Sequence, residues 1–144
     1  MITLKYGEKA IEVKITFKTA NQFSKKYCPK DTSIIDLISD KMGDFDGDFL
    51  IDMVQFFQVN ENKLSKEEVE DFLSDYFADD NDEHDVISLY CDILDEFDIS
   101  GAFKKGLFKG LAKQMRSQMG EMMASLEKGN LNLPNVNEIV TSQK

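Results

Sequence analysis

The 144-residue sequence contains no tryptophan, one histidine and two cysteines. Cys28 and Cys91 are far apart and neither belongs to a CxxC motif, so we expect two reduced thiols without a catalytic role. His84 has no plausible Ser or Cys nucleophile to act with, and neither of the glycine-rich nucleotide-binding motifs follows a strand pattern. These absences predict a protein that is not an enzyme and uses no cofactor.

Long apolar runs are also missing from the sequence. No segment approaches the roughly 20 apolar residues of a membrane-spanning helix. The N-terminus alternates Lys with apolar residues, whereas a signal peptide has a continuous apolar core. We therefore expect a cytoplasmic protein without a membrane partner.

Arginine is absent from the first 99 residues, where ten Lys face twenty-four Asp and Glu and give a net charge of −14. Residues 100–144 carry seven Lys and Arg and three Glu, a net charge of +4. The total of −10 repels phosphates and disfavours a nucleic-acid partner. The reversal predicts an acidic globular domain over residues 1–101, a basic amphipathic helical arm over 102–127 and a flexible tail over 128–144.

The first seventeen residues have the period-two pattern of a β-hairpin with one buried face. Apolar residues alternate with polar ones on both sides of Gly7. They are Ile2, Leu4 and Tyr6 before it and Ile11, Val13, Ile15 and Phe17 after it.

Helical spacing of the apolar residues follows the hairpin pattern. It predicts helices over about residues 19–29, 34–43, 49–57, 65–77 and 86–97. Thr19 is expected to cap the first helix and Asp31 or Thr32 the second, while Ser65 and Glu68 have the spacing of a capping box. The predicted fold is α+β and mainly helical: an N-terminal β-hairpin packed against a bundle of about four to five short helices, followed by a long C-terminal amphipathic helix.

The arm over residues 102–127 carries an apolar stripe whose members recur every three or four positions. This stripe and the adjoining Phe108 form the expected partner-binding surface, which consists of Phe103, Leu107, Phe108, Leu111, Met115, Met119, Met122 and Leu126. Gly106, Gly110 and Gly120 each cost about 1 kcal/mol relative to Ala in a helix, so the arm needs a surface that covers its stripe. Its own domain could provide that surface. The flexible methionines also suit a separate partner, and the glycines and the unpatterned tail favour that alternative.

Two acidic segments resemble metal sites. Three aspartates within residues 44–48 imitate the start of a calcium loop, but the Gly and the bidentate Glu that the loop requires are missing at the matching positions. The run over residues 79–85 places several carboxylates around His84 without a second His or a thiolate. We expect both segments to be solvated loops that hold no metal.

Two longer segments resemble the tail assembly chaperones of long-tailed phages and prophages of Gram-positive bacteria. The first is ITLKYGEKAIEVKITFKTANQFSKKY, a hairpin pattern that leads into a helix. The second comprises KLSKEEVEDFLSDYF and DVISLYCDILDEFDISGAFKK, two acidic helices that end at small residues. Together with the order of the elements, they extend the resemblance over about two thirds of the chain.

The resemblance implies a noncatalytic protein that binds the tape measure protein in the cytoplasm of the bacterial host and keeps it soluble, with the tail tube protein as a second candidate partner. The charge reversal also predicts a homo-oligomer, in which the basic arm of one copy lies on the acidic body of the next. An alternative from another class is a small acidic regulatory protein that sequesters a basic or DNA-binding partner.

Overall fold

The structure is a computed structural model that describes residues 1–44, 46–81 and 83–127, without the side chains of residues 119 and 122–127. The elements are β1 (Ile2–Tyr6), β2 (Lys9–Val13), α1 (Phe17–Tyr27), α2 (Ile34–Gly43), α3 (Gly47–Phe57), α4 (Lys66–Phe77), α5 (Val86–Ile99) and α6 (Leu107–Glu127). This order confirms a mainly helical fold with an N-terminal β-hairpin. The predicted tail over residues 128–144 lies outside the described residues.

The hairpin is antiparallel and turns at Gly7, whose φ of 60° suits a residue without a side chain. Leu4 pairs with Ile11, and both side chains are buried. The predicted alternation is wrong at its two ends, because Tyr6 is 38% exposed and Phe17 is 64% exposed. The strand has already ended at Phe17, which is the first residue of α1.

The outer edge of β2 is covered by the chain that leaves α3. The Val59 amide donates to the Glu12 carbonyl at 2.8 Å, and the Lys14 amide donates to the Phe57 carbonyl at 3.1 Å. The Asn60 side chain adds a bond in each direction, accepting from the Glu12 amide and donating to the Ala10 carbonyl. These bonds satisfy an edge that would otherwise expose unpaired backbone groups.

Two helix starts differ from the prediction. Thr16 caps α1, and Thr19 is its partner at the third helical position, with each side chain close to the other's backbone amide. Ser33 caps α2 by accepting from the Asp36 amide, so the predicted caps at Asp31 and Thr32 are wrong by one or two residues. Asp31 adopts a left-handed φ of 67° in the preceding turn.

The capping box at the start of α4 is confirmed. The Ser65 hydroxyl accepts from the Glu68 amide at 3.1 Å, while the Glu68 carboxylate accepts from the Ser65 amide at 3.0 Å. The helix buries Val69, Phe72 and Leu73 and leaves its acidic face in solvent.

An aromatic cluster forms the centre of the core. Phe23 of α1 packs against Phe57 of α3 with ring centroids 5.0 Å apart, and Phe57 meets Phe97 of α5 edge to face at 5.4 Å. Phe97 in turn stacks on Phe108 of α6 at 5.1 Å. The helices α1, α3, α5 and α6 therefore share one continuous apolar cluster.

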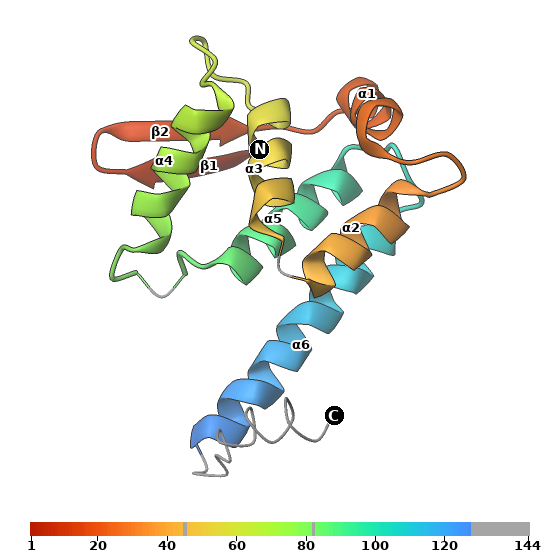
Figure 1. Ribbon diagram of the computed structural model, residues 1–144. Helices are drawn as coiled ribbons and strands as arrows, with labels where there is room; N and C mark the ends of the chain where they lie inside the picture. Colours follow the sequence, from red (N-terminus) through yellow and green to blue (C-terminus); the bar gives the residue numbers. More distant parts are fainter. Residues whose placement is uncertain (45, 82, 128–144) are drawn as a thin grey trace, which may run out of the picture.

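The predicted helical arm begins five residues later than expected, because residues 102–106 form a turn. Gly101 and Gly106 take φ values of 73° and 89°, which residues with a side chain rarely adopt. The chain reverses here, so that α6 packs along α5, and the C-terminal part of α6 extends away from the other elements (Figure 1). The amphipathic pattern of the last two turns of α6 stays a prediction because those side chains are not described.

Candidate partner-binding surface

The connection between α5 and α6 spans residues 100–106 and is held by hydrogen bonds. We call this turn the corner. The Gly106 amide donates to the Asp98 carboxylate at 2.8 Å, and the Ala102 amide donates to the Ser100 hydroxyl at 3.2 Å. These bonds hold the turn that sends α6 back along α5, and they set which face of α6 meets the core.

Phe108 faces the core and is fully buried. It stacks on Phe97, and Phe103 closes over both rings, with centroids 5.0 Å from Phe108 and 6.2 Å from Phe97. Ala112, one turn further along α6, is also fully buried. In this conformation Phe108 packs inside its own chain and is not available to a partner, which corrects its expected place on the partner-binding surface.

Other members of the expected surface are more accessible. Leu107 is 42% exposed, and Leu111 and Met115 are half-buried where α6 meets the core. We call Leu107, Leu111 and Met115 the α6 stripe. Phe103 precedes α6 and is half-buried against Phe97 and Phe108. The side chains of the last three predicted members, Met119, Met122 and Leu126, lie outside the described residues.

Among the described residues, Ile99 is the most exposed large apolar residue, with 75% of its surface accessible, and it was not part of the expected partner-binding surface. It is the last residue of α5 and lies beside the corner. The buried face of α5 ends at Phe97. The position of Ile99 outside that helical period was the signal that could have identified it.

Ion pairs also join α6 to α5. The Arg116 guanidinium donates to Asp95 Oδ2 at 3.2 Å and lies 3.8 Å from Asp92 Oδ1. Burial raises the pKa of the Asp92 carboxyl, and the charge of Arg116 opposes that effect. Because these side chains are about half exposed, we expect the pairs to orient α6 more than to stabilise it.

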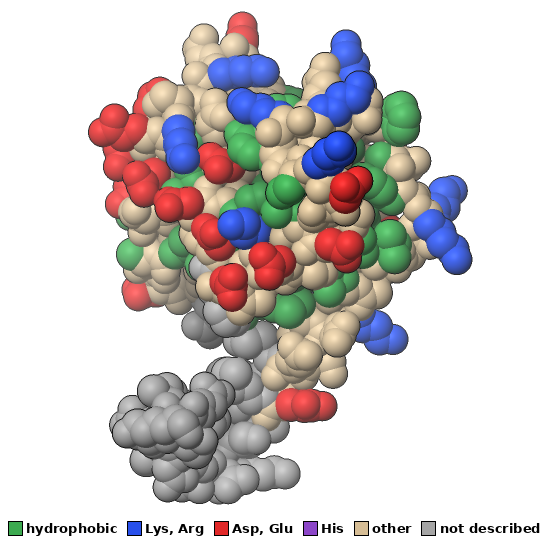
Figure 2. Space-filling view, turned by 45° about the vertical axis from the view of Figure 1, so that its right-hand side comes forward, with side chains coloured by type: hydrophobic (Ala, Val, Ile, Leu, Met, Phe, Trp, Pro, Cys, Tyr) green, Lys and Arg blue, Asp and Glu red, His purple; other side chains and the backbone are tan. Residues whose placement is uncertain are grey.

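The surface charges are unevenly distributed. Lys104, Lys105, Lys109 and Lys113 are all exposed at the corner and on the first turns of α6. In Figure 2, acidic side chains gather over the left and centre of the visible face, and basic ones lie mostly along its upper and right-hand parts. Acidic and basic side chains are thus partly separated on this face of the molecule.

A comparison with protein families identifies the chain. The profile of the family described as phage tail assembly chaperone protein matches residues 3–110, which is 108 of the 144 residues. The chain belongs to the phage tail assembly chaperone family. This match confirms the resemblance found in the sequence. No curated protein and no solved structure gave a significant match.

The match to the tail assembly chaperones covers the hairpin, α1 to α5 and the first turn of α6. The described part of α6 after residue 110, which extends away from the other helices, lies outside the family match. Membership in the family therefore rests on the acidic body, the corner and the buried Phe108.

The cysteines of this tail assembly chaperone are free thiols. The Cys91 thiol is buried and donates to the Ala112 carbonyl at 3.7 Å. Burial raises the pKa of Cys91, which disfavours the thiolate that nucleophilic chemistry would need.

The first of the predicted acidic segments has a structural role in the chaperone. Asp46 caps α3 by accepting from the Phe49 amide at 3.0 Å, and this bond lowers the pKa of Asp46, with a further contribution from Lys41. The Asp46 carbonyl accepts from the Tyr90 hydroxyl at 2.6 Å. The segment thus joins α3 to α5.

In the second acidic segment, the His84 ring stacks on Tyr76 with centroids 3.9 Å apart, and its Nδ1 lies 3.1 Å from Asp79 Oδ2.

Across the described residues, no group of three or more His, Cys, Asp or Glu side chains could hold a metal ion. None of the helices that the structure describes is long and apolar enough to cross a bilayer.

Proposed function

We propose that this tail assembly chaperone binds the tape measure protein and keeps it soluble during tail assembly in the host cytoplasm, without catalysing a reaction. The α6 stripe, together with the predicted Met119, Met122 and Leu126, would form the contact. Family membership supports a role with a tail protein, and the partial exposure of the α6 stripe is the observation that carries the assignment to α6. The tail tube protein is the second candidate partner.

The shape of the contact follows from how α6 leaves the body. Its first turns are held by Phe108 and Ala112, while the following turns extend beyond the other helices (Figure 1). A helix anchored at one end can lay its apolar face against a helical partner, as in helix-in-groove recognition. The methionines further along α6 would adapt to more than one register of a long helical partner.

Charge gives the complex its solubility in this proposal. The net charge of −10 on each chain makes complexes repel one another. A partner helix whose apolar residues are covered by the chaperone would therefore stay in solution. The alternative of an acidic regulator that sequesters a DNA-binding protein uses the same charge, but the acidic helices lie inside the family match and give it no separate support.

Co-expression with the tape measure protein tests the proposal. The wild-type chain should keep the tape measure protein in the soluble fraction and bind it on a column. Leu107→Asp should weaken binding about tenfold or more, since burying an unpaired carboxylate in an apolar contact costs several kcal/mol. The exposure of Leu107 means that the substitution should leave the fold intact.

Lys109→Gln is the matched control, because it removes a charge from an exposed position two residues away. It should change binding about twofold at most, and mainly at low salt. The proposal is wrong if the Leu107→Asp chain, folded by circular dichroism, solubilises the tape measure protein as well as the wild type does.

A further inference from the structure

The hydrogen bonds on the covered edge of β2 show which backbone groups of β1 point outward. Both backbone groups of Glu12 point away from β1, because its amide donates to Asn60 and its carbonyl accepts from Val59. The Ala10 carbonyl also points away from β1, toward the Asn60 side chain. In an antiparallel pair, the residue directly opposite such a position turns its own amide and carbonyl outward as well.

Thr3 and Lys5 are therefore the residues of β1 whose backbone groups point outward. Thr3 is opposite Glu12, and Lys5 is opposite Ala10. Within residues 1–44, 46–81 and 83–127, the amides and carbonyls of Thr3 and Lys5 have no hydrogen-bond partner, and both residues are exposed. Backbone groups without a protein partner are nearly always in contact with water. The outer edge of β1 thus presents two donors and two acceptors with which an extended chain can pair.

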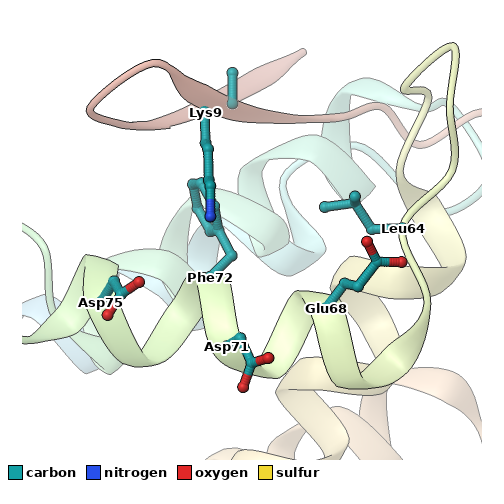
Figure 3. Close-up of a pocket in the computed structure, with 7 residues that line it drawn as sticks. Lys9, Leu64, Glu68, Asp71, Phe72 and Asp75 are labelled. Atoms are coloured by element: carbon teal, nitrogen blue, oxygen red, sulfur yellow. The ribbon is translucent and has the colours of Figure 1, made fainter.

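The apolar side chains of β1 that are incompletely buried lie on one face of the hairpin. Lys9 extends from the hairpin toward α4 (Figure 3), and Tyr6, its partner in the register, shares that face. Because side chains alternate along a strand, Ile2 also lies on the α4 side. Ile2 is half-buried and Tyr6 is 38% exposed. A strand beside β1 would cover both residues if its side chains on this face were apolar.

Lys5 sets the charge that suits a strand at this edge. Its side chain is the one charged side chain of β1, and it forms no ion pair with the described residues. A carboxylate opposite Lys5 would be a favourable cross-strand pair, whereas a second cation there would be unfavourable. The edge therefore fits an extended segment that alternates apolar with polar residues and places Asp or Glu opposite Lys5.

We propose that the outer edge of β1 binds such an extended, acidic segment of another protein by strand addition. The segment forms main-chain hydrogen bonds with Thr3 and Lys5, and its apolar side chains cover Ile2 and Tyr6. The outward backbone groups and the charge of Lys5 carry this assignment. It goes beyond tape measure binding, because the site lies outside the α6 stripe and takes an extended partner rather than a helical one.

Amide hydrogen exchange of the full chain, measured by NMR, tests the edge residue by residue. The probe is a seven-residue peptide in which Val alternates with Thr and with one Glu. In the free chain the Thr3 and Lys5 amides should exchange fast, whereas the Leu4 amide, which faces β2, should exchange slowly. An excess of peptide should slow exchange at Thr3 and Lys5 about tenfold or more. Unchanged exchange at these two amides would overturn the proposal.

Two substitutions at Lys5 separate the role of its amide from that of its charge. Lys5→Pro removes an outward amide and no bond to β2, so the hairpin should stay folded. It should weaken peptide binding about tenfold or more. Lys5→Thr is the matched control, because it keeps the amide and removes only the charge, and it should weaken binding about threefold. Equal binding of the peptide to the wild type and to folded Lys5→Pro would overturn the proposal.

N-methylated peptides test the pairing without a change in the protein. Methylation of the peptide amides that face β1 should weaken binding about tenfold or more, and methylation of the alternate amides should change it about twofold at most. Equal binding of the two methylated peptides would contradict strand addition. Protection of Thr3 and Lys5 in the free chain that rises with protein concentration would also overturn the proposal, because the edge would then belong to a second copy.

Discussion

Removal of the Phe108 ring should destabilise the whole molecule. The ring is fully buried and packs on Phe97 and Phe103 at the junction of α5 and α6. Phe→Ala substitutions at such positions cost about 3–5 kcal/mol of unfolding free energy, through lost burial and the cavity that remains. A domain of this size has about 5–15 kcal/mol in total, so Phe108→Ala should remove a large share of it.

Urea denaturation followed by circular dichroism measures this effect. With a denaturant dependence of about 2 kcal/mol/M, a loss of about 4 kcal/mol lowers the midpoint by about 2 M. Leu107→Ala is the matched control, because the neighbouring side chain is 42% exposed and should cost about 1 kcal/mol or less. Equal, small effects of the two substitutions would show that α6 is not part of the cooperative unit.

The predicted boundary between the domain over residues 1–101 and the arm can be tested in the same way. A chain that ends at Gly101 lacks Phe108 and Ala112, which are part of the core. We expect that truncated chain to be at least as destabilised as Phe108→Ala. If it unfolds cooperatively with the stability of the full chain, the acidic body is an independent domain as the charge pattern predicts.

Two further predictions concern the core and the helix starts. Burial raises the pKa of Tyr90 above its usual value near 10, so the folded state keeps a proton that the unfolded state loses. The free energy of unfolding should therefore fall as the pH rises above about 10. Unfolding experiments at pH 8 and 11 should show a smaller fall for Tyr90→Phe than for the wild type. A pH dependence that Tyr90→Phe leaves unchanged would count against this account. Ser65→Ala removes the acceptor for the Glu68 amide and should cost about 1 kcal/mol in urea denaturation, while no measurable cost would show that the capping box is dispensable.

Local patterns in the sequence predicted the elements well where each end had a distinct chemical signal. The start of α4 was predicted correctly because Ser65 and Glu68 have the spacing and side chains of a capping box. The start of α1 was missed because Thr16 and Thr19 form a capping box without Glu or Gln. Because Thr16 and Thr19 can both act as caps and lie only three positions apart, the sequence alone did not show which of them caps the helix.

The face of α6 that meets the core was harder to predict. The stripe from Phe103 to Leu126 assumed an unbroken helix from residue 102, whereas the turn at Gly106 starts the helical period anew at Leu107. The face of α6 that packs against the core therefore contains Phe108 and Ala112. A small residue such as Ala adds little to a hydrophobic pattern, so tertiary packing decided a position that periodicity left open.

Binding of the tape measure protein along α6 can be tested by amide hydrogen exchange of the full chain with and without a soluble segment of that partner. Free α6 should exchange faster beyond Ala112 than in its anchored first turns, since the latter pack on α5. Binding should slow exchange over residues 111–127 and leave α4 unchanged. Slower exchange confined to the hairpin and α4, with α6 unaffected, would contradict the proposed binding surface.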